Sequence, residues 1–78
     1  MRYVYLLQSE AGEHYVGVTS DLKQRLSEHN VGKSPHTAKY VPWKLVTYLA
    51  FSNAEKAEAF ERYLKSGSGH AFARKRLW

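Results

Sequence analysis

Two runs near the N-terminus have the pattern of strands, and hydrophobic and polar residues alternate weakly in the first. Residues 2–8 and residues 14–18 are rich in Tyr, Val and Leu, which favour strands with at least one buried face. Residues 9–13 separate the two runs with turn-forming side chains, and Gly12 is free to take a positive φ angle. The short connection predicts an antiparallel hairpin.

The next segment changes to the period of a helix. Leu22 and Leu26 lie four residues apart on its expected core face, and Arg25 and His29 lie four apart on the adjacent stripe. Its expected boundaries are Thr19 or Ser20 as the cap, Asp21 in the first turn, and Asn30 and Gly32 at the end.

The second half of the chain predicts one more strand and two more helices. Residues 31–43 follow neither period and are interpreted as a long loop, a kind of segment that often carries function. Residues 44–51 alternate and predict a strand. Ser52 and Glu55 form a capping-box pattern for a helix over about 53–65. The Ser-Gly-Ser-Gly segment at 66–69 is expected to end it, before a short last helix over about 70–76.

Length and composition narrow the class of protein. A chain of 78 residues predicts one domain, spanning residues 1–78, with a single modest core. The absence of cysteine excludes disulfides, thiolate metal sites and a cysteine nucleophile. No apolar run approaches the roughly 20 residues of a membrane span, and the N-terminal segment lacks the apolar core of a signal peptide. We therefore expect a cytoplasmic protein.

The charge of the chain suggests a class of partner. A net charge of +5 indicates a polyanion, of which nucleic acid is the commonest, although a basic surface can also serve solubility alone. Seven basic residues are candidates for contacts with a nucleic-acid backbone, because phosphates supply most of the affinity for such ligands. They are Lys33, Lys39, Lys44, Lys65, Arg74, Lys75 and Arg76, and the alternative is that they are ordinary solvated surface charges.

Glu61 is the sharpest candidate for chemistry. It falls within the apolar stripe formed by Ala57, Phe60 and Leu64, where a carboxylate is costly unless something compensates its charge. Mg²⁺ would do so, because it often takes one or two carboxylates and keeps several waters. The alternative is an ion pair with Arg or Lys at the edge of the stripe, and periodicity alone favours that alternative.

Four other side chains suit phosphodiester hydrolysis. Arg25 can hold a phosphate with two hydrogen bonds, and His29 titrates near neutrality and can transfer a proton or polarise a tyrosine. Tyr5 and Tyr15 fall on facing strands of the hairpin. A phenol has a pKa near 10 and is a poor base unless a nearby cation lowers that value. The alternative for Arg25 and His29 is that both are solvated helix residues. The alternative for Tyr5 and Tyr15 is that they form an aromatic cross-strand pair.

Several segments together resemble one protein family. Tyr3-Val4-Tyr5 and Tyr15-Val16-Gly17 are followed by Thr19-Ser20-Asp21-Leu22, by Arg25 and His29, and by Ala57, Glu61 and Lys65 at intervals of four. With the segments 36–46 and 63–69, this order resembles the GIY-YIG nuclease superfamily, in its small single-domain bacterial branch. The resemblance covers nearly the whole chain. Tyr3 departs from the pattern, because the first motif of the family begins with Gly.

The resemblance implies a fold and an activity. It implies an α+β domain with a small three-stranded antiparallel sheet flanked by helices, which agrees with the strand–strand–helix–strand–helix–helix order. It also implies an endonuclease that cuts nucleic acid with one Mg²⁺ or Mn²⁺ ion, and DNA is favoured over RNA as the substrate. Glu61 would hold the metal, Arg25 would stabilise the phosphate, and Tyr5 and Tyr15 would bracket the attacking water with help from His29. The alternative is a basic nucleic-acid-binding module with little catalysis, acting with a protein partner or as a homodimer.

Overall fold

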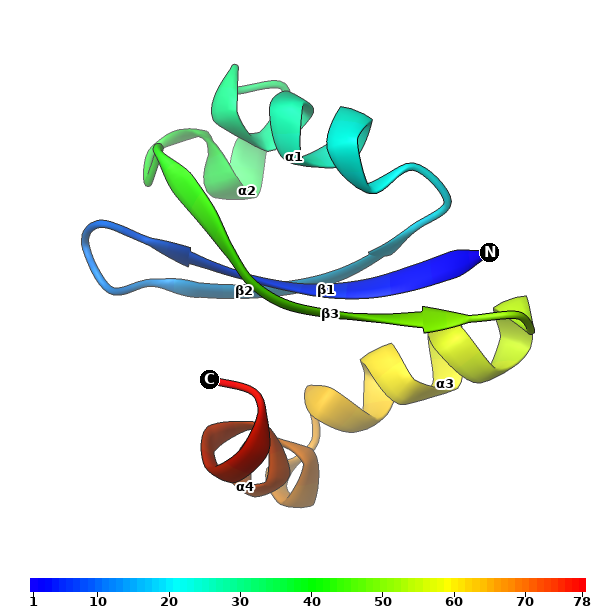
Figure 1. Cartoon of the computed structure of the whole chain (residues 1–78). Coiled ribbons are helices and arrows are strands. Elements are labelled where there is room, and N and C mark those ends of the chain that lie inside the picture. Colours follow the sequence, from blue (N-terminus) through cyan, green and yellow to red (C-terminus); the bar gives the residue numbers. More distant parts are fainter.

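A three-stranded antiparallel sheet separates two layers of helices (Figure 1). The computed structural model describes residues 1–78, and its α+β architecture confirms the expected fold class. In chain order the elements are β1 (Arg2–Ser9), β2 (His14–Thr19), α1 (Leu22–Asn30), α2 (Pro35–Ala38), β3 (Trp43–Phe51), α3 (Ala54–Leu64) and α4 (Gly67–Arg76). Helices α1 and α2 cover one face of the sheet, and α3 and α4 lie on the other (Figure 1). No helix has the length and apolar character that crossing a membrane requires.

Strand β1 occupies the centre of the sheet, with the strand order β2-β1-β3. The predicted hairpin joins β1 to β2 through a turn in which Gly12 has a φ angle of 88°. In the register, Tyr5 stands opposite Gly17 on β2 and opposite Tyr48 on β3. The central position buries β1 on both faces, which explains why residues 4–7 are all nearly inaccessible instead of alternating.

The two faces of β1 contribute to two separate hydrophobic clusters. Val4 and Leu6 pack with buried residues of α3 and α4, namely Ala57, Leu64 and Ala73. Tyr5 and Leu7 pack with Trp43 on the opposite face, where Leu22 and Leu26 of α1 cover them. The second cluster therefore places the first expected site tyrosine beneath the helix that carries Arg25 and His29.

The structure corrects the predicted cap of two helices. Asp21, rather than Thr19 or Ser20, caps α1 and accepts a hydrogen bond from the Gln24 N–H at 3.1 Å. The side chain that caps α3 belongs to Asn53, so the predicted capping box of Ser52 and Glu55 is wrong. Asn and Asp are as favourable as Ser at this position, so a run of several polar residues leaves the first residue of a helix ambiguous.

Two further boundaries differ from the prediction. Residues 35–38, predicted as part of a loop, form the one-turn helix α2, which Pro35 begins. Helix α4 starts at Gly67 instead of residue 70, because the Ser66 hydroxyl caps it by accepting the Gly69 N–H. Gly69 lies against the backbone of Tyr63, where a Cβ atom would collide with the carbonyl group. Gly69 therefore allows α3 and α4 to approach closely.

Candidate functional site

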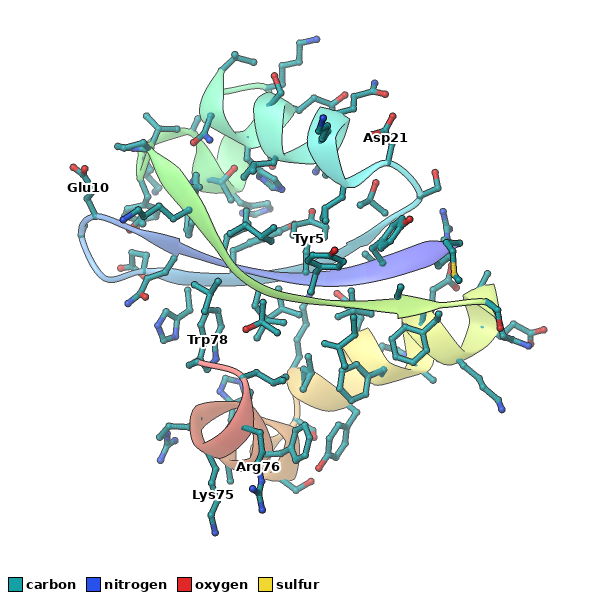
Figure 2. All side chains as sticks on the ribbon, viewed as in Figure 1. Tyr5, Glu10, Asp21, Lys75, Arg76 and Trp78 are labelled. Carbon is teal, nitrogen blue, oxygen red and sulfur yellow. The ribbon has the colours of Figure 1, made fainter.

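Tyr5, His29 and Thr37 form a buried chain of hydrogen bonds between the sheet and the α1–α2 layer. The Tyr5 hydroxyl lies 3.0 Å from His29 Nε2, and His29 Nδ1 lies 2.8 Å from the Thr37 hydroxyl. The exposed fractions of these three residues are 1%, 0% and 1%. Figure 2 shows Tyr5 on the sheet below α1, the helix that supplies His29. Two elements distant in sequence thus meet at one imidazole.

The hydrogen bonds define the protonation of His29. The Thr37 hydroxyl faces the Ser34 carbonyl at 3.4 Å, to which it can donate its proton, so it accepts from His29 Nδ1–H. His29 Nε2 then remains as the acceptor for the Tyr5 hydroxyl. Burial lowers the pKa of His29, and the neighbouring Arg25 charge lowers it further. The imidazole is therefore neutral near pH 7 and able to accept the proton of Tyr5.

Burial has a strong effect on the Tyr5 phenol. It raises the pKa of Tyr5 to about 12, while the Arg25 guanidinium opposes this shift and the negative charges of Tyr15 and Glu61 add to it. The expected lowering of a tyrosine pKa by a nearby cation is therefore outweighed at Tyr5. A phenol with this pKa does not lose its proton to bulk water at neutral pH. It needs an acceptor at hydrogen-bonding distance, which is the position of His29.

Arg25 lies beside both tyrosines and is held by an acidic neighbour. Its guanidinium donates to the Glu28 carboxylate at 2.8 Å, which raises the pKa of Arg25 and lowers that of Glu28. The charges of Tyr5 and Tyr15 also favour the protonated Arg25. Arg25 is only partly exposed, and a guanidinium has five N–H donors, so the Glu28 contact leaves several donors for a phosphate.

Tyr15, on strand β2, lies beside Tyr5 and His29. Its ring meets the edge of the His29 ring with centroids 4.8 Å apart and lies 6.2 Å from the Tyr5 ring. Tyr15 is half-buried, in contrast to Tyr5. Gly17, the last residue of the second motif, lies so close to the Tyr5 hydroxyl that a Cβ atom would overlap it. The hairpin therefore needs a glycine at this position to admit the phenol.

Glu61 lies in the other helical layer, on the opposite side of the sheet from Arg25 and His29. It lies on α3, its side chain is 15% exposed, and its carboxylate forms an ion pair with Lys65. This pair is the contact that the alternative interpretation of Glu61 predicts. Glu61 is nevertheless within electrostatic reach of Tyr5, because its charge contributes to the raised pKa of that phenol. Tyr5, Tyr15, Arg25 and His29 are thus brought together, and the charge of Glu61 acts on Tyr5 from α3.

The donor set restricts the kind of metal that the site suits. No three side chains of the His, Cys, Asp or Glu type gather anywhere in the protein to enclose an ion. Mg²⁺ commonly binds through one or two carboxylates and completes its shell with waters and substrate phosphate. A single, largely shielded Glu61 fits an ion of that kind, whereas a structural zinc site would need four ligands.

The basic residues do not gather on one element. Lys33 and Lys39 flank α2, Lys44 lies on β3, and Lys65 and Arg74 belong to the α3–α4 layer, so the set is divided between the two sides of the sheet (Figure 1). All five are exposed. Lys65 is the one that contacts an expected site residue, through its ion pair with Glu61. Their contact with nucleic acid stays a prediction.

The structure also gives supporting roles to three residues, of which Thr37 and Glu28 were not singled out by the sequence and Gly17 was known only as part of a motif. Thr37 holds His29, Glu28 holds Arg25, and Gly17 makes room for Tyr5. The spacing of three residues from Arg25 to Glu28 is a helical ion-pair signal that identifies Glu28. Thr37 lies in a segment without periodicity, and only the fold brings it to His29.

Comparison with known proteins finds similar sequences over most of the chain. The sequence profile of the GIY-YIG catalytic domain matches residues 1–75. A UPF0213 protein of Streptococcus pneumoniae (strain ATCC BAA-334/TIGR4) is 38% identical over 64 residues, which cover 81% of this chain and 65% of that relative. A UPF0213 protein of Streptococcus agalactiae (serotype V) is 36% identical over 70 residues, covering 88% and 80%. The chain thus spans less than two thirds of the pneumococcal relative.

A solved structure supports the fold. The solution NMR structure of a UPF0213 protein from Bacillus halodurans matches with a TM-score of 0.59 and 32% sequence identity, covering 96% of this chain and 84% of that one. The resemblance drawn from the two tyrosine motifs is confirmed. Because the catalytic-domain profile spans nearly the whole chain and a solved relative shares its fold, this protein belongs to the GIY-YIG family.

Proposed function

We propose that this protein is a metal-dependent endonuclease that hydrolyses phosphodiester bonds of nucleic acid, with DNA as the expected substrate. The GIY-YIG family implies a nuclease type of activity. The observation that carries the proposal is the chain from Tyr5 through His29 to Thr37, in which a phenol has a neutral imidazole as its proton acceptor. A reactive hydroxyl, a base and a group that orients the base are the elements of an activated side chain.

The chain of hydrogen bonds supplies a path for one proton. As the attacking water forms its bond to phosphorus, its proton passes to the Tyr5 oxygen, and the proton of Tyr5 passes to His29 Nε2. Tyr5 keeps its own proton until that step because its pKa is about 12. Thr37 fixes the imidazole with Nε2 toward the phenol. The bond from phosphorus to the leaving oxygen breaks, and that oxygen takes a proton from solvent.

Tyr15 and Arg25 act on the water and the phosphate. Tyr15 is the more accessible phenol, and its hydroxyl makes no hydrogen bond within the protein, so it is free to orient the water. Arg25 has donors beyond those that Glu28 uses and lies beside both tyrosines. We assign it to the phosphoryl oxygens, where charge accumulates in the transition state.

Glu61 is the residue that would hold a divalent ion. Mg²⁺ or Mn²⁺ bound there supplies a positive charge that polarises the phosphate and stabilises the leaving oxygen. Glu61 contributes the carboxylate, and Lys65, its present ion-pair partner, is freed to contact the nucleic-acid backbone. With an ion bound, the carboxylate would exchange its ammonium partner for the metal.

The test is cleavage of a panel of labelled single strands, duplexes, flaps, junctions and RNA. Each is incubated with Mg²⁺, with Mn²⁺ and with chelator. Glu61→Ala is compared with Glu55→Ala, which alters an exposed glutamate in the first turn of the same helix. Metal-dependent cutting by the parent and Glu55→Ala, but not by Glu61→Ala, supports the proposal. Equal cutting by all three proteins would contradict the proposed role of Glu61 as metal ligand.

A second candidate is a basic binding module without catalysis. The observation that favours it is the ion pair of Glu61 with Lys65, because it satisfies the carboxylate without a metal. This candidate predicts salt-sensitive binding of nucleic acid and no cutting with any metal. The same panel, run with a binding readout at several salt concentrations, separates the two candidates.

A further inference from the structure

A cavity of about 240 Å³ opens between the edge strand β2 and helices α3 and α4. It is formed by residues from three separate parts of the chain. They are His14, Tyr15, Val16, Leu64, Lys65, His70, Ala73 and Trp78. Figure 2 shows Trp78 in the space between α4 and the sheet, while Lys75 and Arg76 project from α4 away from the sheet.

One wall of the cavity is flat and aromatic. The rings of His14 and Trp78 are stacked, with centroids 3.8 Å apart and an angle of 11° between their planes. Val16, Leu64 and Ala73 add aliphatic surface to the lining. The volume lies below the about 300–1,000 Å³ of sites for drug-sized ligands. A planar heterocycle the size of one nucleobase therefore suits the cavity in shape and in size.

The polar groups of the lining suit an anion attached to that heterocycle. Lys65 supplies an ammonium group, and His14 and His70 supply ring nitrogens, while no Asp or Glu side chain lines the cavity. A base with its phosphate is the ligand that combines a planar ring with negative charge. Stacking on aromatic side chains accepts every base, because every base has a π-face.

The cavity adjoins the candidate active site. Tyr15 lines the cavity and also contacts the His29 ring, and Lys65 lines it and pairs with Glu61. A strand whose phosphate lies between Arg25 and Glu61 therefore has a neighbouring nucleotide at the mouth of the cavity. We propose that the cavity binds one unstacked base next to the phosphate under attack, so that single-stranded or unpaired nucleic acid is the preferred substrate. This inference rests on the proposed nuclease function.

The first experiment measures binding without cleavage. A short single-stranded DNA is titrated into the ¹⁵N-labelled protein in chelator, beside the same DNA with one abasic residue. We expect the Trp78 indole N–H signal, assigned with Trp78→Phe, to shift with the intact DNA. We expect the abasic DNA to bind about 5- to 150-fold more weakly, the range for loss of one stacked base. Equal affinities, or a Trp78 signal that does not move, overturn the inference.

Variants locate the effect in the cavity. Trp78→Ala and His70→Ala should each weaken binding of the intact DNA and reduce the difference between intact and abasic DNA. Phe72→Ala is the matched control, because Phe72 is an exposed aromatic residue of α4 that does not line the cavity. An equal loss in Phe72→Ala contradicts the assignment. A Trp78 shift that depends on protein concentration without DNA identifies a second copy of the chain as the occupant and also overturns it.

The two proposals fail in different ways. A Trp78 shift with no metal-dependent cutting of any substrate contradicts the nuclease and leaves the base-binding cavity in place. Cutting that is lost in Glu61→Ala, together with equal binding of intact and abasic DNA, contradicts the cavity alone. A preference for duplex over single strands in the cleavage panel also contradicts it.

Discussion

The hydroxyl group of Tyr5 lies against Gly17, its partner in the β1–β2 register. A Cβ atom at position 17 would overlap the phenol oxygen and touch the ring of Tyr15. The glycine of the second sequence motif is therefore explained by the tyrosine of the first. Its role is to leave space for the phenol.

Gly17→Ala should destabilise the protein and displace Tyr5 from His29. Overpacking of a well-packed site costs about 1–3 kcal/mol, and about 1 kcal/mol shifts the midpoint of thermal unfolding by roughly 4–8 °C in a domain of this size. Gly67→Ala is the control, because nothing lies within 4 Å of a Cβ atom there and alanine favours the helix. Thermal unfolding followed by circular dichroism checks both variants. A Gly17→Ala protein as stable as the parent would contradict the close approach.

Thr37→Val should remove the hydroxyl that fixes His29 while keeping the shape of the side chain. It leaves the buried Nδ1–H without its acceptor, a loss that costs about 1–3 kcal/mol. Cleavage should fall as well, because the imidazole is then free to adopt the other tautomer. Thr37→Ser retains a hydroxyl and should recover most of the activity. Loss of stability with unchanged cleavage would assign Thr37 to the core alone.

The sequence predicted the elements of the sheet better than the contacts across it. Alternation located all three strands because one or both of their faces are buried. Helix caps were less predictable, since Ser52, Asn53, Thr19 and Asp21 are chemically interchangeable at that position. Helix α2 escaped prediction because four residues are too few to show a period.

For the candidate site, the sequence likewise predicted the main residues but not the contacts that support them. Tyr5, Tyr15, Arg25, His29 and Glu61 were identified by their order along the chain. Their supports depend on distance in space: Thr37 meets His29 only after the chain has turned through α2. The raised pKa of the Tyr5 phenol could not be predicted either, because it is dominated by burial, which a sequence pattern does not measure.

Stability should depend on pH through His29. Its pKa is lowered in the folded protein, so below about pH 6.5 the unfolded chain binds a proton that the folded protein resists. Stability is complete above the unfolded pKa and is lost as the pH falls toward the folded pKa, by at most about 1.4 kcal/mol per pH unit for one proton. Arg25 strengthens this effect, and Glu28 opposes it.

Urea unfolding of the parent and of His29→Gln at pH 7.5, 6.5 and 5.5 measures this dependence. The other three histidines are present in both proteins, so the difference between the two pH profiles belongs to position 29. We expect the parent to lose more stability than the variant on acidification. Parallel profiles would show that His29 is not the group responsible.

Glu28→Gln should release Arg25 from its ion pair without removing the guanidinium. The carboxylate now accepts a short hydrogen bond from Arg25 and a second one from Gln24. Without the charge of Glu28, Arg25 is held less firmly beside the tyrosines. We expect weaker cleavage with a smaller effect than Arg25→Ala, and Glu55→Gln serves as a distant control on an exposed helix face. Cleavage equal to that of the parent would mean that Arg25 needs no such support.

Lys65→Met should distinguish the two interpretations of Glu61. Removing the ammonium leaves a shielded carboxylate without its partner, which strengthens its attraction for a divalent ion. The parent offers one carboxylate that is already paired, so we expect Mn²⁺ to bind it only weakly in the absence of nucleic acid. Paramagnetic broadening of amide signals near Glu61 by Mn²⁺ measures that affinity directly.

Tighter binding in Lys65→Met, abolished in the double variant with Glu61→Gln, would identify Glu61 as the ligand. No broadening near Glu61 in either protein would leave the carboxylate as the partner of Lys65 and favour the binding module.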